Sequence, residues 1–155
     1  MTDTAPSGRE PVTFREIRFG SEEYRLECAL REEVLRAPLG LSLESEDLSR
    51  EEGQLHYGLF GPDGILAACV VAVPLSATAV AVRQMAVAPS RQRRGLGRRL
   101  VGELEDRLRA RGFRRVELKA RLSAAGFYEE LGYETEGAEF VEVTIPHVRM
   151  VKILR

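Results

Sequence analysis

The sequence predicts a single α/β domain, with a mixed sheet of roughly six to seven strands flanked by about four helices. Three observations predict it. The chain has 155 residues, of which 44% are hydrophobic, enough to bury one core. Runs with the alternating pattern of strands are interleaved with runs that have helical spacing. Their order is β-α-β-β-β-α-β-α-β-β, without internal repeats or signs of a second domain.

The N-terminal part is expected to contain a tail, a strand and a helix. Residues 1–11 carry prolines and a glycine and predict a short disordered tail, which leaves residues 12–155 as the domain. Residues 13–19 alternate and predict a strand. Residues 22–36 predict a helix, and residues 44–53 a loop or partial helix. The helical spacing is set by Leu26, Ala29, Leu30, Val34 and Leu35.

Two hairpins are predicted next. Strands over residues 54–60 and 65–75 flank the sequence Gly-Pro-Asp-Gly at 61–64, which strongly favours a turn. A second turn at residues 74–77 leads into a strand over residues 79–88.

The C-terminal part continues with a long helix that follows residue 95 and ends at Gly112. A strand over residues 114–119 and a short helix over 124–131 come next. Two strands are expected near residues 133–142 and 147–154. The long helix carries one apolar stripe, formed by Leu96, Leu100, Val101, Leu104 and Leu108.

Residues 84–100 are the most informative stretch. A strand stops at Pro89, a basic turn with Gly95 and Gly97 follows, and a helix then begins. Such a turn directs backbone N–H groups and the positive end of the helix dipole at one spot. The glycines let a ligand approach the main chain closely. The stretch therefore predicts a phosphate cradle, with added positive charge from Arg91, Arg93, Arg94, Arg98 and Arg99.

Three kinds of phosphate cradle compete for this stretch. A P-loop needs Lys-Ser/Thr after its second glycine, where this chain has Arg98 and Arg99. A dinucleotide-binding fingerprint needs a third glycine, where the chain has Leu100. The third candidate is Gln-x-x-Gly-x-Gly at residues 92–97, preceded by Val-x-Pro at 87–89. This pattern resembles motif A of the GNAT family of N-acetyltransferases.

A second pattern strengthens the resemblance, which extends over residues 12–154. Residues 124–133 have the form Ala-x-x-Phe-Tyr-x-x-Leu-Gly-Tyr, which is similar to GNAT motif B. The resemblance implies acetyl-CoA as co-substrate, with its pyrophosphate on the turn amides and its pantetheine arm along the preceding strand. An Asn that much of the family has before the motif B Tyr is Arg121 here. The implied cofactor-binding residues are Met85, Ala86, Val87, Gln92, Arg93, Arg94, Gly95, Leu96, Gly97, Arg98 and Arg121.

The resemblance also implies a catalytic residue. Tyr128 would protonate the departing thiolate, since a phenol stays protonated at neutral pH. The backbone near Val87 would donate to the carbonyl oxygen. Many family members carry a Glu base on the strand before the cradle, but this strand offers Gln84. The base is left open between a water chain and three side chains: His147, Glu142 and Glu33. For His56 we expect a hydrogen-bonded structural role.

The expected function is transfer of an acetyl group from acetyl-CoA to a primary amine, by direct attack in a ternary complex. The acceptor is not identified; it would be a metabolite, an antibiotic-like amine or a protein amine, bound by loops around residues 36–53 and 137–147. The alternative is a non-catalytic module that binds and senses acyl-CoA.

Composition indicates which partners and which cellular compartment to expect for this protein. The net charge is −1, with 23 basic and 24 acidic residues, which argues against a nucleic-acid partner. We expect no membrane association, because no apolar run has the length of a span. Cys28 and Cys69 lack metal-binding spacing, so we expect no metal and free thiols in the cytoplasm. The oligomeric state is left open, although similar folds often pair as homodimers.

Overall fold

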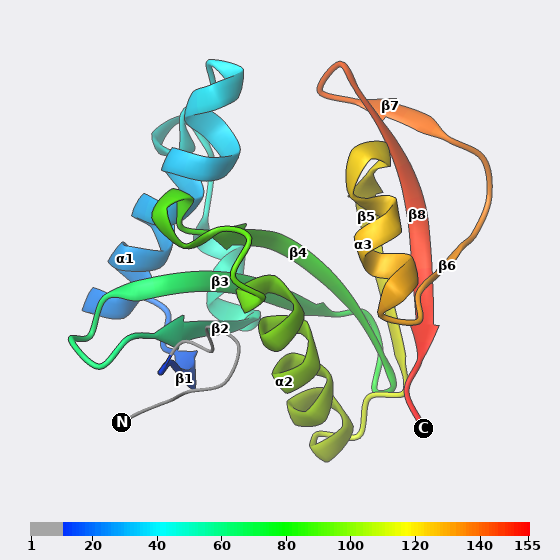
Figure 1. Cartoon of the computed structure of the whole chain (residues 1–155), viewed down its shortest axis with the longest axis horizontal. Coiled ribbons are helices and arrows are strands. Elements are labelled where there is room, and N and C mark those ends of the chain that lie inside the picture. Colours follow the sequence, from blue (N-terminus) through cyan, green and yellow to red (C-terminus); the bar gives the residue numbers. More distant parts are fainter. Residues whose placement is uncertain (1–10) are drawn as a thin grey trace. The chain divides into compact units, whose positions relative to one another are not determined.

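The computed structural model describes residues 11–155, so the tail predicted at residues 1–11 lies almost wholly outside the described residues. Figure 1 shows a mixed α/β architecture, which confirms the predicted fold class. The described part contains eight strands and three α-helices. They are β1 (Thr13–Ile17), α1 (Glu22–Arg31), β2 (Leu55–Phe60), β3 (Leu66–Pro74), β4 (Ala79–Val87), α2 (Leu96–Ala110), β5 (Arg115–Arg121), α3 (Ala125–Glu130), β6 (Glu134–Thr135), β7 (Phe140–Glu142) and β8 (Ile145–Ile153).

The chain forms two compact units, and β3, β4 and α2 contribute to both. The first unit comprises the residues up to Val71 together with Gln84–Leu104. The second comprises Ala72–Arg83 and Glu105–Arg155. Each unit contains its own part of the sheet, whose strand order is β1-β2-β3-β4-β5-β8-β6, with β7 paired to β8. The strand count exceeds the expected number because the segment predicted as one strand at 133–142 forms two short ones.

The first unit begins with an antiparallel pair. β1 and β2 pair from Thr13 opposite Phe60 to Ile17 opposite His56. The predicted β2–β3 turn is present, with Gly64 in the left-handed region at φ +82°. The core cluster of this unit consists of Ile17, Tyr24, Leu30, Phe60, Leu66, Cys69 and Ala86.

Helix α1 and the segment after it bury only part of the predicted apolar spacing, namely Leu30, Val34 and Leu35. Ser21 caps the helix by accepting a hydrogen bond from the Tyr24 amide. Leu26, part of the expected apolar spacing, is 43% exposed, while Glu27 and Arg31 are fully buried. Two charged side chains can occupy the inner face because they form an ion pair of 2.7 Å. The predicted helix continues past Arg31 as a wider π-helical segment over Glu32–Arg36.

The second unit is organised around β8. β5 and β8 pair antiparallel from Arg115 opposite Ile153 to Arg121 opposite His147, and β6 and β7 pair with the same strand β8. β4 joins β5 in parallel, in a register that covers Ala79–Val82. In Figure 1, β7 and β8 form a long hairpin beside α3.

Both helices of the C-terminal half end as predicted. Gly112 and Gly132 follow α2 and α3 in the left-handed region, at φ +95° and +97°. The amide of Tyr133 donates to the carbonyl oxygen of Tyr128 at 3.0 Å, which closes the end of α3. The apolar stripe predicted for α2 is buried along its whole length: Leu96, Leu100, Val101, Leu104 and Leu108.

One acidic residue of α2 is buried in the second unit with two partners. The carboxylate of Glu105 accepts hydrogen bonds from the Tyr133 hydroxyl and from Lys152 Nζ, both at 2.9 Å. Lys152 Nζ also donates to the Leu131 carbonyl oxygen at 2.6 Å. These bonds satisfy a carboxylate that is only 5% exposed, and they tie α2 to the end of α3 and to β8.

Candidate active site

The turn between β4 and α2 has the backbone geometry of an anion cradle. Arg93 and Gly95 both lie in the left-handed region, at φ +65° and +79°, on either side of Arg94. Such departures from ordinary handedness turn successive N–H groups toward one concave side of the chain. The first helical hydrogen bond runs from the Arg99 amide to the Gly95 carbonyl oxygen, so the amides of residues 96–98 precede it.

The space in front of the turn is open. Apart from Gly95 and its two neighbours in the chain, no atom of residues 11–155 lies within 4 Å of the position that a Cβ on Gly95 would take. A phosphate group can therefore approach the main chain at this point. The residues predicted to bind it are arranged accordingly: Arg93, Arg94 and Arg98 are exposed, while Leu96 is buried and offers only its main chain.

Gln92 holds the turn against the end of β4. Its side-chain Nε2 donates to the Val87 carbonyl oxygen at 3.0 Å. The side chain is thus bound to the protein's own main chain rather than presented as a separate ligand. The hydrogen bond uses one lone pair of the Val87 carbonyl oxygen and ties the turn to the end of β4.

β4 is irregular just before the residues expected to contact the cofactor. Gln84 has φ +58°, a left-handed conformation that costs a residue with a Cβ about 1–2 kcal/mol. Met85 and Val87, which follow it, are half-buried, and Ala86 is buried. The parallel register with β5 ends at Val82, so this irregular segment lies beyond it.

Tyr128, the predicted proton donor, is in the second unit on α3. Its side chain is 9% exposed and packs edge-on against the rings of Phe127 and Tyr133. Burial raises the pKa of Tyr128 to about 12. The phenol therefore stays protonated at neutral pH, but full transfer of its proton to a thiolate with an ordinary pKa of about 8.5 is uphill. A protonated phenol of this pKa is able to donate a hydrogen bond to a developing thiolate.

Of the three side chains considered as general base, His147 has the most defined arrangement. Its Nδ1 lies 2.7 Å from the Ile145 carbonyl oxygen, which only accepts, so Nδ1 carries the proton and Nε2 holds the lone pair. The ring stacks on Phe140 and lies opposite Arg121 in the β5–β8 register. By contrast, Glu142 is exposed and paired with Lys119 at 3.2 Å, and Glu33 is exposed on the π-helical segment.

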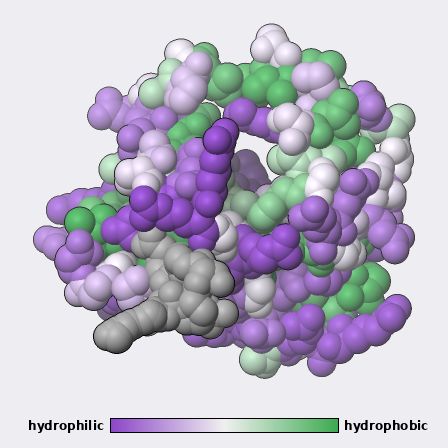
Figure 2. Space-filling model, viewed as in Figure 1, coloured by the Kyte–Doolittle hydropathy of each residue, from purple (hydrophilic) through white to green (hydrophobic). Residues whose placement is uncertain are grey.

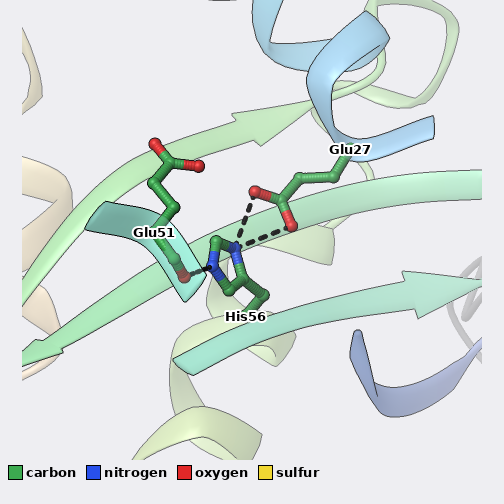
Figure 3. Close-up of side chains that lie close together, drawn as sticks. All are labelled: Glu27, Glu51 and His56. Carbon is green, nitrogen blue, oxygen red and sulfur yellow. Dashed lines mark hydrogen bonds and ion pairs between the residues drawn. The ribbon is translucent and has the colours of Figure 1, made fainter. Parts of the chain in front are cut away.

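His56 is buried in a network of charged groups, as its predicted structural role requires (Figure 3). Its Nδ1 faces the carboxylate of Glu27, and its Nε2 lies 2.8 Å from the Glu51 carbonyl oxygen. Arg31 donates to Glu27 at 2.7 Å and to both oxygens of Glu51, at 2.8 and 2.7 Å. The Tyr24 hydroxyl also donates to Glu51, at 2.6 Å.

The same network contains three groups of types that can bind a metal ion. One ligand atom from each of Glu27, Glu51 and His56 lies within 4.8 Å of the others. However, both carboxylates already bind Arg31, a cation that a metal would have to displace. Both nitrogens of the ring face acceptors, and neither directs a lone pair at a shared centre. The donor set therefore fits an internal ion network.

The loop after α1 is fixed by two arginines and borders a pocket. Glu51 binds Arg31, and Glu46 binds Arg36 at 2.6 Å, so two carboxylates of this acidic loop are engaged in ion pairs. A pocket of about 480 Å³ lies between α1 and the loop, in the first unit. Apolar groups and two carboxylates line it, among them Cys28, Leu43, Leu48, Glu32 and Glu44.

Sequence reasoning did not identify Arg31, Arg36 or Glu46 as important. The spacing of Glu27 and Arg31 does favour an ion pair along a helix, but such pairs are usually exposed. Glu27 and Arg31 can be buried only because Glu51 and His56 bind them. The sequence near Glu27 and Arg31 does not indicate these partners.

Comparison with known proteins identifies the family. The family model described as "Acetyltransferase (GNAT) domain" matches residues 47–154. The chain belongs to the GNAT acetyltransferase family. The resemblance predicted from the two motifs is thereby confirmed. The uncharacterized protein YyaT of Bacillus subtilis is 43% identical over 58 residues, which are 37% of this chain and 39% of YyaT. The chain thus spans less than half the length of the curated relatives it matches.

Solved structures share the GNAT fold. An aminoglycoside 6'-N-acetyltransferase complexed with coenzyme A superposes with a TM-score of 0.75 at 18% identity, covering 92% of this chain and 97% of that protein. A GNAT family acetyltransferase from Elizabethkingia anophelis with acetyl-CoA bound gives a TM-score of 0.71 at 15% identity, covering 94% and 100%. At these identities the similarity establishes the fold alone.

Among residues 11–155, no helix is both long and apolar enough to cross a bilayer. Charged and apolar residues are interspersed over the face seen in Figure 2, in keeping with a net charge of −1. Within the described part of the chain, Cys28 is half-buried, Cys69 is buried, and both thiols are free.

Proposed function

We propose that this protein is an acetyl-CoA-dependent N-acetyltransferase that transfers an acetyl group to a primary amine by direct attack in a ternary complex. The observation that carries the proposal is the turn at Arg93–Gly95, with its two left-handed residues, open space over Gly95 and a helix start behind it. Membership of the GNAT family supports acetyl-CoA as the ligand of this cradle. Complexes of proteins with the same fold support the same cofactor.

Different groups of the protein are assigned to different parts of acetyl-CoA. The amides of residues 95–98 and the side chains of Arg93, Arg94 and Arg98 hold the pyrophosphate. The main chain of Met85 to Val87 holds the pantetheine arm as an added strand would, and the Val87 amide donates to the carbonyl oxygen. Arg121 takes the place of the family's usual Asn as a cofactor contact.

Acetyl-CoA supplies the acetyl group as a thioester, an acyl donor that a neutral amine can attack. The amine must first lose a proton, which a base or a water chain accepts. As the new C–N bond forms and the C–S bond breaks, Tyr128 donates a hydrogen bond to the sulfur. Among the side chains considered for the base, His147 Nε2 has the lone pair best suited to accept the proton.

We assign the acceptor to the pocket between α1 and the following loop. Its volume of about 480 Å³ suits a small molecule or the end of a peptide chain. Its lining combines apolar side chains with the carboxylates of Glu32 and Glu44, a combination that favours a primary ammonium on an apolar body.

The proposal is tested by calorimetric titration with acetyl-CoA, with desulfo-CoA and adenosine bisphosphate as controls. We expect micromolar binding that Gly97→Glu weakens by more than tenfold, since the new carboxylate repels phosphate at the helix start. A panel of amines is then screened for release of free thiol. Binding without thiol release from any amine would favour the alternative, a module that senses acyl-CoA. Gln84, which occupies the position where many family members carry a Glu base, supports this alternative. Absence of binding would refute both.

A further inference from the structure

The left-handed residue in β4 is held by a side chain from another element. Gln84 has φ +58° without being glycine, so its surroundings must maintain this conformation. Arg36, the last residue of the π-helical segment, donates from Nη2 to Oε1 of the Gln84 side chain at 3.0 Å. A guanidinium only donates, so the atom of the amide that faces it is the oxygen.

Arg36 is in turn fixed by the loop that follows it. Its Nε and Nη2 bind the two carboxylate oxygens of Glu46, at 2.6 and 3.3 Å. Its carbonyl oxygen accepts from the Leu41 amide at 3.0 Å. The Arg36 side chain is only 13% exposed, and the hydrogen bond from it holds the pKa of Glu46 below its ordinary value. The fork geometry therefore leaves the guanidinium little freedom.

The held residue directly precedes the segment that the proposed function assigns to the cofactor. A change of φ at residue 84 redirects the amides and carbonyls of Met85 to Val87, because the main chain is rigid apart from φ and ψ. Among residues 11–155, Arg36 is the hydrogen-bond donor to the Gln84 side-chain oxygen. The contact thus connects the loop beside the acceptor pocket with the strand beside the cradle, both within the first unit.

We infer that Arg36, fixed by Glu46, is a positioning residue: through the Gln84 side chain it keeps residue 84 left-handed and so aims the main chain of Met85–Val87. The conformational part of this inference stands on the structure alone. Its effect on acetyl-CoA rests on the proposed function.

Glycine at position 84 provides the decisive test, because it adopts φ +58° without support. We expect Arg36→Ala to speed amide hydrogen exchange at residues 85–87 in the ligand-free protein and to weaken acetyl-CoA binding about tenfold. Gln84→Gly is expected to bind acetyl-CoA like the wild type. The double variant Arg36→Ala/Gln84→Gly is expected to match Gln84→Gly alone. Arg25→Ala, which removes an exposed arginine of α1, is the matched control.

Three outcomes overturn the inference: unchanged exchange at residues 85–87 in Arg36→Ala, an equal loss of binding in the Gln84→Gly background, or the same loss in Arg25→Ala. If Arg36→Ala does not fold, Arg36→Lys replaces it, since a lysine keeps the charge but cannot bind Glu46 and Gln84 as a fork. If the wild type binds no acetyl-CoA, the proposed function fails, and the exchange measurements still decide the role of Arg36.

Discussion

The imidazole of His56 faces the carboxylate of Glu27 through Nδ1, which lies 3.0 Å from each carboxylate oxygen. Its Nε2 faces the Glu51 carbonyl oxygen, another group that only accepts. With Glu27 ionised, both ring nitrogens face acceptors, an arrangement that favours the doubly protonated ring. Burial alone would lower the pKa of His56, but the hydrogen bond and charge of Glu27 outweigh it and raise the pKa above its ordinary value.

Stability is therefore expected to depend on the protonation of His56. A raised folded-state pKa gives stabilisation that is complete below the unfolded value of about 6.5 and is lost as pH rises through the folded value. We expect the free energy of unfolding to fall over this range in the wild type and to lose this dependence in His56→Gln. Urea unfolding at a series of pH values measures it. The chain has 2 histidines, so His147→Gln is the control and keeps the wild-type slope. Equal slopes in His56→Gln and the wild type would contradict the assignment.

Two glycines with similar φ angles are expected to differ in their effect on acetyl-CoA binding. Gly95 and Gly64 have φ +79° and +82°, and beyond their chain neighbours no described atom lies within 4 Å of a Cβ added to either. Alanine at either position is expected to destabilise the fold by about 1–2 kcal/mol. Only Gly95→Ala is expected to weaken acetyl-CoA binding, because its methyl group occupies the approach to the turn. Thermal unfolding and calorimetry separate the two effects. Equal affinities in both variants would place the phosphates elsewhere.

Tyr128→Phe tests the donor role on α3. We expect kcat to fall about a hundredfold with little change in acetyl-CoA affinity, since the hydroxyl acts only as the thiolate develops. The neighbouring Tyr133→Phe is the control: it removes a hydroxyl bonded to Glu105 and is expected to lower stability with kcat retained. Steady-state kinetics and thermal unfolding report on both. A parallel loss of kcat and affinity in Tyr128→Phe would rule out a specific role in the transition state.

The hydrogen bond from Gln92 to Val87 predicts an indirect effect on the cofactor. Gln92→Met keeps the length of the side chain but cannot donate to the Val87 carbonyl oxygen. We expect severalfold weaker acetyl-CoA binding with faster amide exchange in residues 88–95, because the turn is no longer tied to β4. Faster exchange with unchanged affinity would show that the tie is unimportant for the ligand.

Local turn and helix chemistry explains why much of the fold could be predicted. Gly61–Gly64, Gly112 and Gly132 end their elements where the sequence indicates, and the stripe of α2 is buried as its spacing requires. The order of strand, turn and helix predicted for residues 84–100 is also confirmed. These features depend on residues close together in the sequence.

The remainder depends on contacts between distant residues. Gln84 and Arg93 are left-handed although neither is the residue type that favours this region, so propensity gives no signal for them. Glu27 and Arg31 are buried because residues 51 and 56 complete their charges, which no periodicity in α1 can reveal. Such partners become visible only when the chain is folded.

The charge balance of the buried network constrains how the family can diverge at these positions. Glu27 and Glu51 are compensated by Arg31 and His56, so replacing one member alone leaves an uncompensated charge in the core. We expect paired substitutions among homologous sequences. Where position 56 is not histidine, position 27 should not carry a carboxylate. Positions 27 and 56, which are 29 residues apart in the chain, would then covary.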